Sequence, residues 1–170
     1  PQKSIDSIMV YVGFEKVSRS GKNLTKQHQG IKLDASAIAK GYSVDRVGRF
    51  LESKVVINYM VEIGGEVRVK GTNPKQMKWR IGIDKPQENP IVTDDREIQA
   101  ILNINHGSIA TSGNYRQFYV KDGKKYAHTI TPKTGFPIQH DLLSVSVWAP
   151  NCMTADAYAT AFMVLGYQIS

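Results

Sequence analysis

The stretch "DASAIAKGYSVDRVGRFLES", residues 34–53, begins with small side chains and continues as an amphipathic helix pattern. Four apolar residues recur in it at helical spacing: Val44, Val47, Phe50 and Leu51. This spacing predicts the first long helix over about 39–53. Small residues and the pair Lys40-Gly41 stand where a packed helix would favour bulky side chains, so something must approach the backbone closely at this helix start.

Shorter elements precede this helix. Apolar residues at helical spacing before Gly13 predict a helix over residues 3–12. The polar segment "FEKVSRSGKNLTKQHQGIKL" predicts a hairpin with its turn near residues 20–22.

Strands dominate the middle of the chain. "VVINYMVEIGGEVRVKG" predicts two strands separated at Gly64-Gly65. Five further segments have strand composition: "KWRIGID", "EIQAILNI", "RQFYV", "KKYAHTI" and "LLSVSVWA". "KDGKK", residues 121–125, is expected to form a hairpin turn. A last helix, "TADAYATAFMVLG", is expected with Thr154 as its N-cap and Gly166 as its stop. The fold class is therefore α+β, a mostly antiparallel sheet flanked by helices.

Composition limits the classes of protein that fit. The chain has 170 residues, of which 41% are hydrophobic and 22% charged, which is typical of one globular domain. No run approaches the roughly 18 to 20 apolar residues of a membrane span, and the first residues lack a signal-peptide pattern, so the chain as given is expected to be soluble. A single cysteine, Cys152, excludes an internal disulfide and a multi-thiolate metal site, and it is expected to be a buried small residue.

The net charge of +7 comes from 22 Lys and Arg residues that are scattered singly. A solvated basic surface explains this pattern, and attraction of a phosphate-rich ligand or an acidic partner is the functional alternative. Nucleic-acid binding is not expected, because no element interleaves basic and aromatic residues.

Three motifs carry candidate chemistry. Asp156 and Thr160 lie four residues apart in the last helix, so both oxygens face one side and suit Mg²⁺, although an acidic residue in a first turn is also favoured by the helix dipole. "HGSIATSGNYR", residues 106–116, either brings its backbone close to a phosphate or planar ring or forms a polar turn. His128 stands where a strand meets a loop, as an acid, base or ligand or only as a hydrogen-bonded side chain.

Six blocks of the sequence resemble one protein family in order, form and separation. They are "DASAIAKGYSVD", "VEIGGEVRVKG", "WRIGID", "SIATSGNYR", "AHTITPKTGFP" and "CMTADAYATAFMVLG". Through these blocks, nearly the whole chain is similar to the ApbE family, flavin transferases once described as thiamine-biosynthesis lipoproteins. Chance does not account for six matched blocks, so the resemblance is specific.

The resemblance implies an ApbE-like, T-fold-related architecture and the activity of an FAD:protein FMN transferase. Such enzymes bind FAD and Mg²⁺ and transfer FMN to a Ser or Thr hydroxyl of an acceptor flavoprotein that carries a flavinylation motif, with release of AMP. They work outside the cytoplasm, so the resemblance implies a periplasmic or outer-face location. Contact with the membrane is expected only through an N-terminal lipid anchor outside these 170 residues.

The functional residues of the family carry over to matching positions. The metal ligands fall on Asp156, Thr160 and the main-chain oxygen of Ala37. The residues near FAD fall on Asp34 and Lys40, and the strand-end His-x-Ile motif falls on His128 and Ile130.

This assignment explains the small residues at the start of the first long helix. If the Ala37 carbonyl serves a metal, no helical amide can engage it, so the helix is expected to begin just after Ala37. Lys40 and Gly41 then present positive charge and amides to an anionic ligand. A small-residue helix packed closely on a sheet is the alternative.

The expected reaction is phosphoryl transfer, in which Mg²⁺ polarises the pyrophosphate and the incoming hydroxyl needs a proton acceptor. His128 is the expected participant in proton transfer, and Asp156 remains an alternative base. The sequence departs from the family at Thr131, where Asp or Asn is common, and we expect only a local change there.

Family proteins are longer than this chain. We therefore expect a single domain over 1–170 that is a fragment lacking the family's N-terminal portion and C-terminal tail. The alternatives to a transferase are an FAD-binding module without activity and an FAD pyrophosphate hydrolase that gives FMN and AMP.

Overall fold

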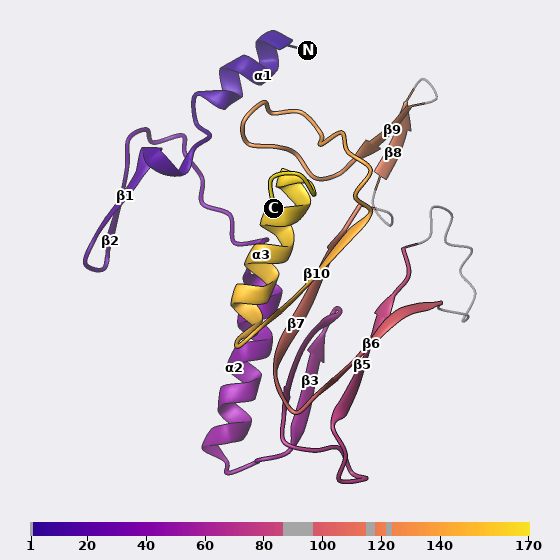
Figure 1. Cartoon of the computed structure of the whole chain (residues 1–170). Coiled ribbons are helices and arrows are strands. Elements are labelled where there is room, and N and C mark those ends of the chain that lie inside the picture. The colour runs from indigo at the N-terminus through magenta and orange to yellow at the C-terminus, as the bar shows by residue number, and fades with distance from the viewer. Residues whose placement is uncertain (1, 87–96, 115–117, 122–123) are drawn as a thin grey trace.

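The computed structural model describes residues 2–86, 97–114, 118–121 and 124–170 (Figure 1). The helices are α1 (Gln2–Met9), α2 (Ala39–Ser53) and α3 (Cys152–Leu165), with one 3₁₀ turn, η1 (Phe14–Lys16). The strands are β1 (Val17–Ser20), β2 (Asn23–Lys26), β3 (Tyr59–Ile63), β4 (Glu66–Lys70), β5 (Trp79–Asp84), β6 (Ile98–Ile104), β7 (His106–Gly113), β8 (Phe118–Lys121), β9 (Lys124–Ala127) and β10 (Ser144–Ala149).

The fold is α+β, as expected. Four strands form one antiparallel sheet in the order β10-β7-β4-β3, and three hairpins, β1-β2, β5-β6 and β8-β9, form sheets of their own. Helices α2 and α3 lie side by side on one face of the four-stranded sheet, and hairpin β5-β6 lies on the other side (Figure 1). The sheet therefore stands between a helical layer and a β-hairpin.

Strand alternation builds a core on each face of the sheet, because successive side chains point to opposite sides. Toward the helices, Tyr59 and Val61 of β3 pack with Val44 and Cys152. Toward the hairpin, a second cluster contains Val67, Val69, Ile81 and Ile109. A third cluster consists of alanines from β7, β10 and α3, namely Ala110, Ala149 and Ala155. These small side chains let α3 lie close to the sheet, and the prediction of a buried Cys152 is confirmed.

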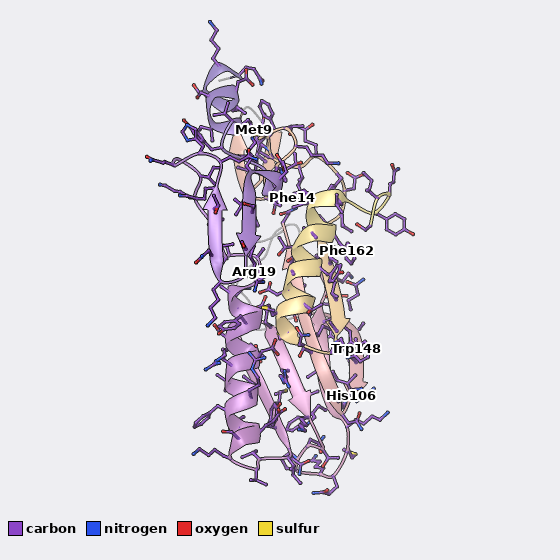
Figure 2. The ribbon with its side chains drawn as sticks, turned by 90° about the vertical axis from the view of Figure 1, so that its left-hand side faces the viewer. Met9, Phe14, Arg19, His106, Trp148 and Phe162 are labelled. Carbon is purple, nitrogen blue, oxygen red and sulfur yellow. The ribbon has the colours of Figure 1, made fainter. Side chains whose placement is uncertain are left out.

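The N-terminal segment extends beyond this layered body. Met9 and Phe14 lie on it toward one end of the molecule, Arg19 lies nearer the middle, and Phe14 is 92% exposed (Figure 2). His106 and Trp148 lie near the opposite end, with ring centroids 6.2 Å apart in an edge-to-face arrangement (Figure 2).

Most element predictions are confirmed, and the first long helix occupies residues 39–53 as expected. The hairpin turn contains Gly21 at φ 61°, and the break between β3 and β4 contains Gly64 and Gly65, both with positive φ. The first helix, however, ends at Met9 and not at residue 12. Its pattern changes there, because Tyr11 N donates to Ile8 O and Val12 N to Met9 O, which are three-residue bonds that tighten and end the helix.

The predicted N-cap of the last helix is wrong. Asn151, not Thr154, caps α3: its Oδ1 accepts from Thr154 N at 2.9 Å, and the helix begins at Cys152. An extended residue with a short polar side chain three positions ahead of an amide is the geometry of an N-cap. The predicted stop at Gly166, with φ 77°, is confirmed.

The segment 106–116 is not a polar turn, because most of it is the strand β7 inside the sheet, while residues 115 and 116 lie outside the described residues. The predicted turn at 121–125 lies within hairpin β8-β9, although residues 122 and 123 are not described. In the described ranges, no helix has the length and apolar character needed to cross a membrane.

Candidate functional site

A cavity of about 860 Å³ lies where α2, α3 and β7 meet the β3-β4 turn and β5. Its volume falls within the range of small-molecule pockets. Five residues singled out in the sequence line it: Ala37, Lys40, His128, Asp156 and Thr160. The fold therefore brings together residues from both ends of the chain around one cavity.

Asp156 supplies a buried carboxylate to the wall of this cavity. Its side chain belongs to the first turns of α3, and the residue is 3% exposed. Its Oδ2 accepts from the amide of Gly41 at 2.9 Å. Within the described part of the chain, Asp156 forms no ion pair, whereas the other buried carboxylates, Asp45 and Glu66, pair with Arg68 and Lys40. Because a buried carboxylate is costly without a compensating cation, this arrangement favours binding of a cation beside Asp156.

Gly41 shows why a residue without a side chain is needed in the first turn of α2. A Cβ at this position would lie 2.8 Å from the Cβ of Asp156 and would collide with the main-chain oxygen of Cys152. Glycine therefore allows α2 and α3 to approach until the Gly41 amide reaches the Asp156 carboxylate. The absence of a side chain at Gly41 therefore accounts both for the close packing of α2 on α3 and for the hydrogen bond to Asp156.

The same amide determines the surroundings of Ala37. In a continuing α-helix, Gly41 N would donate to the carbonyl four residues earlier, that of Ala37. Gly41 N donates instead to Asp156, and α2 begins at Ala39 with Ile38 as its N-cap. The prediction that the helix begins just after Ala37 is thus confirmed, and the Ala37 carbonyl loses its helical partner to Asp156.

Thr160 lies one helical turn beyond Asp156 and also lines the cavity. Its Oγ1 lies 3.2 Å from the hydroxyl oxygen of Ser112, a β7 residue of the segment 106–116 that the sequence analysis singled out. The donor set beside the cavity thus contains a carboxylate, a hydroxyl and a main-chain carbonyl, which are the hard oxygen ligands that Mg²⁺ prefers. Among the described residues no three His, Cys, Asp or Glu side chains gather as a metal site, so a cation here would need the hydroxyl and carbonyl oxygens as well.

Lys40 lines the cavity as part of an ion pair. Its Nζ lies 2.6 Å from Oε1 of Glu66, which is 1% exposed. Burial raises the pKa of Glu66, the hydrogen bond and charge of Lys40 oppose that rise, and the nearby negative charge of Asp156 adds to it. The sequence could have indicated this partner, since Glu66 and Arg68 share the helix-facing side of β4 by strand alternation.

His128 stands at the cavity wall just after β9 ends at Ala127. The next residue, Thr129, donates its hydroxyl to Asn114 Oδ1 at 2.7 Å, which ties this strand end to the segment after β7. This contact of Thr129, which the sequence did not reveal, holds the backbone next to His128 in place.

Two predicted residues do not line the cavity. Asp34 is exposed, and its Oδ1 accepts from Ser36 N at 2.6 Å in a local turn. Its hydrogen bonds to Ser36 lower the pKa of Asp34. Ile130 is 56% exposed and forms an isolated bridge with Pro137.

A polar network beneath the site was missed by the sequence analysis. Asp45 of α2 accepts from the amides of Cys152 and Met153, both at 3.0 Å, and pairs with Arg68 at 2.7 Å. Arg68 also pairs with Glu52 and donates to the Tyr59 hydroxyl. A carboxylate at the N-terminus of α3 is favoured by the helix dipole, so this network fixes the helix that carries Asp156.

Comparison with known proteins gives concordant results. A sequence model described as the ApbE family matches residues 1–170. A Vibrio cholerae protein named FAD:protein FMN transferase is 45% identical over 154 residues, which cover 91% of this chain and 45% of the relative. A Haemophilus influenzae protein of the same name is 43% identical over 160 residues, covering 92% and 45%.

Solved structures agree. The flavin transferase ApbE from Vibrio cholerae matches with a TM-score of 0.85 and 41% identity, over 99% of this chain and 52% of that one. The ApbE protein from Thermotoga maritima gives a TM-score of 0.83 and 31% identity, over 97% and 52%. The chain spans about half the length of the proteins it matches.

Proposed function

The chain belongs to the ApbE family, and from this membership we propose that it acts in magnesium-dependent transfer of FMN from FAD to a Ser or Thr hydroxyl of an acceptor protein. The observation that carries the proposal is the buried Asp156 carboxylate, which lines the cavity without an ion pair in the described residues. The names of the relatives support the choice of substrate and reaction.

Asp156, Thr160 and the main-chain oxygen of Ala37 would hold Mg²⁺, because they line one cavity and provide hard oxygen ligands. When bound, Mg²⁺ would polarise the pyrophosphate and offset negative charge as it develops. Lys40 would face the phosphates from the start of α2. Asp34 and Ile130 would contact FAD from the cavity margin, a role that rests on the family resemblance alone.

His128 would accept the proton of the attacking hydroxyl on a ring nitrogen. The hydroxyl oxygen would bond to the phosphorus of the FMN half of FAD, and the bond from that phosphorus to the oxygen of the AMP half would break, so that AMP leaves with that oxygen. Asp156 is the weaker candidate for the base, because its carboxylate already accepts from Gly41 and would face the cation.

The finer expectations on partners and location rest on the family resemblance. They comprise an acceptor flavoprotein with a flavinylation motif, action outside the cytoplasm and a lipid anchor on the N-terminal side. Each stays a prediction here.

The test is a transfer assay with this chain, FAD, Mg²⁺ and an acceptor that the Vibrio cholerae relative modifies, with that relative as the positive control. The denatured acceptor is weighed by mass spectrometry. We expect a gain of one FMN, lost on chelation of Mg²⁺ and in Asp156→Asn. Asp141→Asn changes an exposed carboxylate outside the cavity and should leave the gain unchanged.

Other outcomes would point elsewhere. FAD converted to FMN and AMP with an unmodified acceptor would make the chain a hydrolase. FAD bound but left whole, while the positive control transfers FMN, would leave only a binding module. Undiminished transfer by Asp156→Asn would remove Asp156 from the metal site.

A further inference from the structure

Glu66 occupies an unusual position behind the cavity. Its side chain is 2% exposed, its Oε1 binds Lys40 Nζ at 2.6 Å, and its Oε2 is buried without a hydrogen-bond partner among the described residues. A buried carboxylate of this kind depends on its one cation for charge compensation. The Lys40 ammonium is therefore held more strongly than a surface lysine would be.

The β3-β4 turn completes this arrangement. A Cβ added at Gly64 would lie 3.6 Å from Lys40 Cδ and 3.8 Å from Glu66 Oε2, so the turn passes beside both partners. Gly64, Gly65 and Lys40 line the cavity, whereas Glu66 lies behind them. The pair thus has a buried anchor and a half-exposed cation at the cavity wall.

We propose that Glu66 is a positioning residue, whose buried carboxylate fixes the Lys40 ammonium at the cavity in the place where it meets a phosphate group of the substrate. The role of Lys40 toward phosphate rests on the proposed function, whereas the coupling of the two side chains does not. If the ammonium is already fixed when the substrate arrives, less conformational entropy of the Lys40 side chain is lost during phosphoryl transfer.

This role makes a specific prediction for Glu66→Gln. The substitution removes a buried negative charge near an anionic ligand, so FAD affinity should be unchanged or higher. The rate of transfer should nevertheless fall by about tenfold or more, because the ammonium is no longer held in place. A general structural defect would instead weaken binding and rate together.

The first readout is independent of activity. Lys40 and Lys85 have side chains of nearly equal exposure, 50% and 52%, but Lys85 pairs with the exposed Glu97. Under competitive labelling with acetic anhydride, followed by mass spectrometry, Lys40 should react several-fold more slowly than Lys85. Glu66→Gln should bring Lys40 to the rate of Lys85, and the matched control Glu97→Gln should leave Lys40 unchanged.

The second readout measures FAD affinity by fluorescence and the transfer rate by acceptor mass, for wild type, Glu66→Gln, Lys40→Met and the double variant. If Glu66 acts through Lys40, it should have no further effect on the rate in Lys40→Met. Equal labelling of Lys40 and Lys85 in wild type, or parallel losses of affinity and rate in Glu66→Gln, would overturn the proposal. Wild type without transfer but with a protected Lys40 would refute the proposed function and leave the coupling in place.

Discussion

At the scale of the residue, the surroundings of His128 and Asp156 distinguish the roles of these two candidate bases. His128 is exposed at the cavity wall, and Asp156 is buried beside Gly41. The two side chains, which the sequence left as rival bases, therefore occupy different environments. An exposed imidazole can exchange a proton with solvent after each turnover, whereas the buried carboxylate is better suited to hold a cation.

For His128→Ala we expect the transfer rate to fall by about 100-fold or more, since a positioned acid or base contributes on that order. FAD affinity should change much less. Measuring the rate constant under saturating FAD and the dissociation constant separately makes the distinction. An equal loss in both quantities would assign His128 to substrate binding.

At the scale of the element, the sequence predicted a helix over about 39–53, where α2 lies, but misplaced the cap of α3. A helix that packs on a sheet needs apolar residues at helical spacing on one side. Val44 and Leu51 have this spacing and pack in the core, so the sequence pattern was sufficient to predict α2. The choice between Asn151 and Thr154 depends on which backbone is extended, and local sequence does not determine that. Both residue types are good N-caps.

The cap assignment predicts unequal effects of two similar substitutions. Asn151→Ala should lower the free energy of unfolding by about 1 kcal/mol, because the amide of Thr154 loses its acceptor. Thr154→Ala should change it by about 0.5 kcal/mol or less. Urea unfolding of both variants measures the difference, and a larger effect at Thr154 would contradict the assignment.

The contact between α2 and α3 predicts a dependence of stability on pH. Burial would raise the pKa of Asp45, but the amides of Met153 and Cys152 and the charge of Arg68 outweigh it and hold the pKa below its ordinary value of 3.8. A carboxylate with a lowered folded-state pKa stabilises the fold above its unfolded-state pKa. That contribution is lost as pH falls below about 3.8 and through the folded-state value.

Asp45→Asn should therefore lower the free energy of unfolding at neutral pH by about 3 kcal/mol, since it leaves Arg68 without its buried partner. It should also flatten the acid limb of the stability profile. Thermal unfolding of wild type and variant between pH 7 and acid pH tests both effects, and parallel profiles would show that Asp45 does not carry the dependence.

At the scale of the whole molecule, the resemblance in six blocks identified the family. Of the seven site residues that it predicted, five line one cavity in the structure. Asp34 and Ile130 are not among its lining residues, although Asp34 is hydrogen-bonded to Ser36, which is. Strand alternation places Glu66 and Arg68 on the helix-facing side of β4, but their ion pairs with Lys40 and Asp45 could not be predicted, because each joins a strand to a helix whose relative placement only the tertiary structure defines.

The bond between Gly41 and Asp156 joins residues 115 positions apart, and that between Asp45 and Cys152 spans 107. Contacts this remote form slowly, because the intervening chain must first be arranged. We therefore expect the cavity to form late in folding, after the sheet is assembled. FAD with Mg²⁺ should then slow the unfolding arm of a stopped-flow chevron and leave the refolding arm unchanged. The ligand would extend the lifetime of the folded chain without increasing the rate at which it folds.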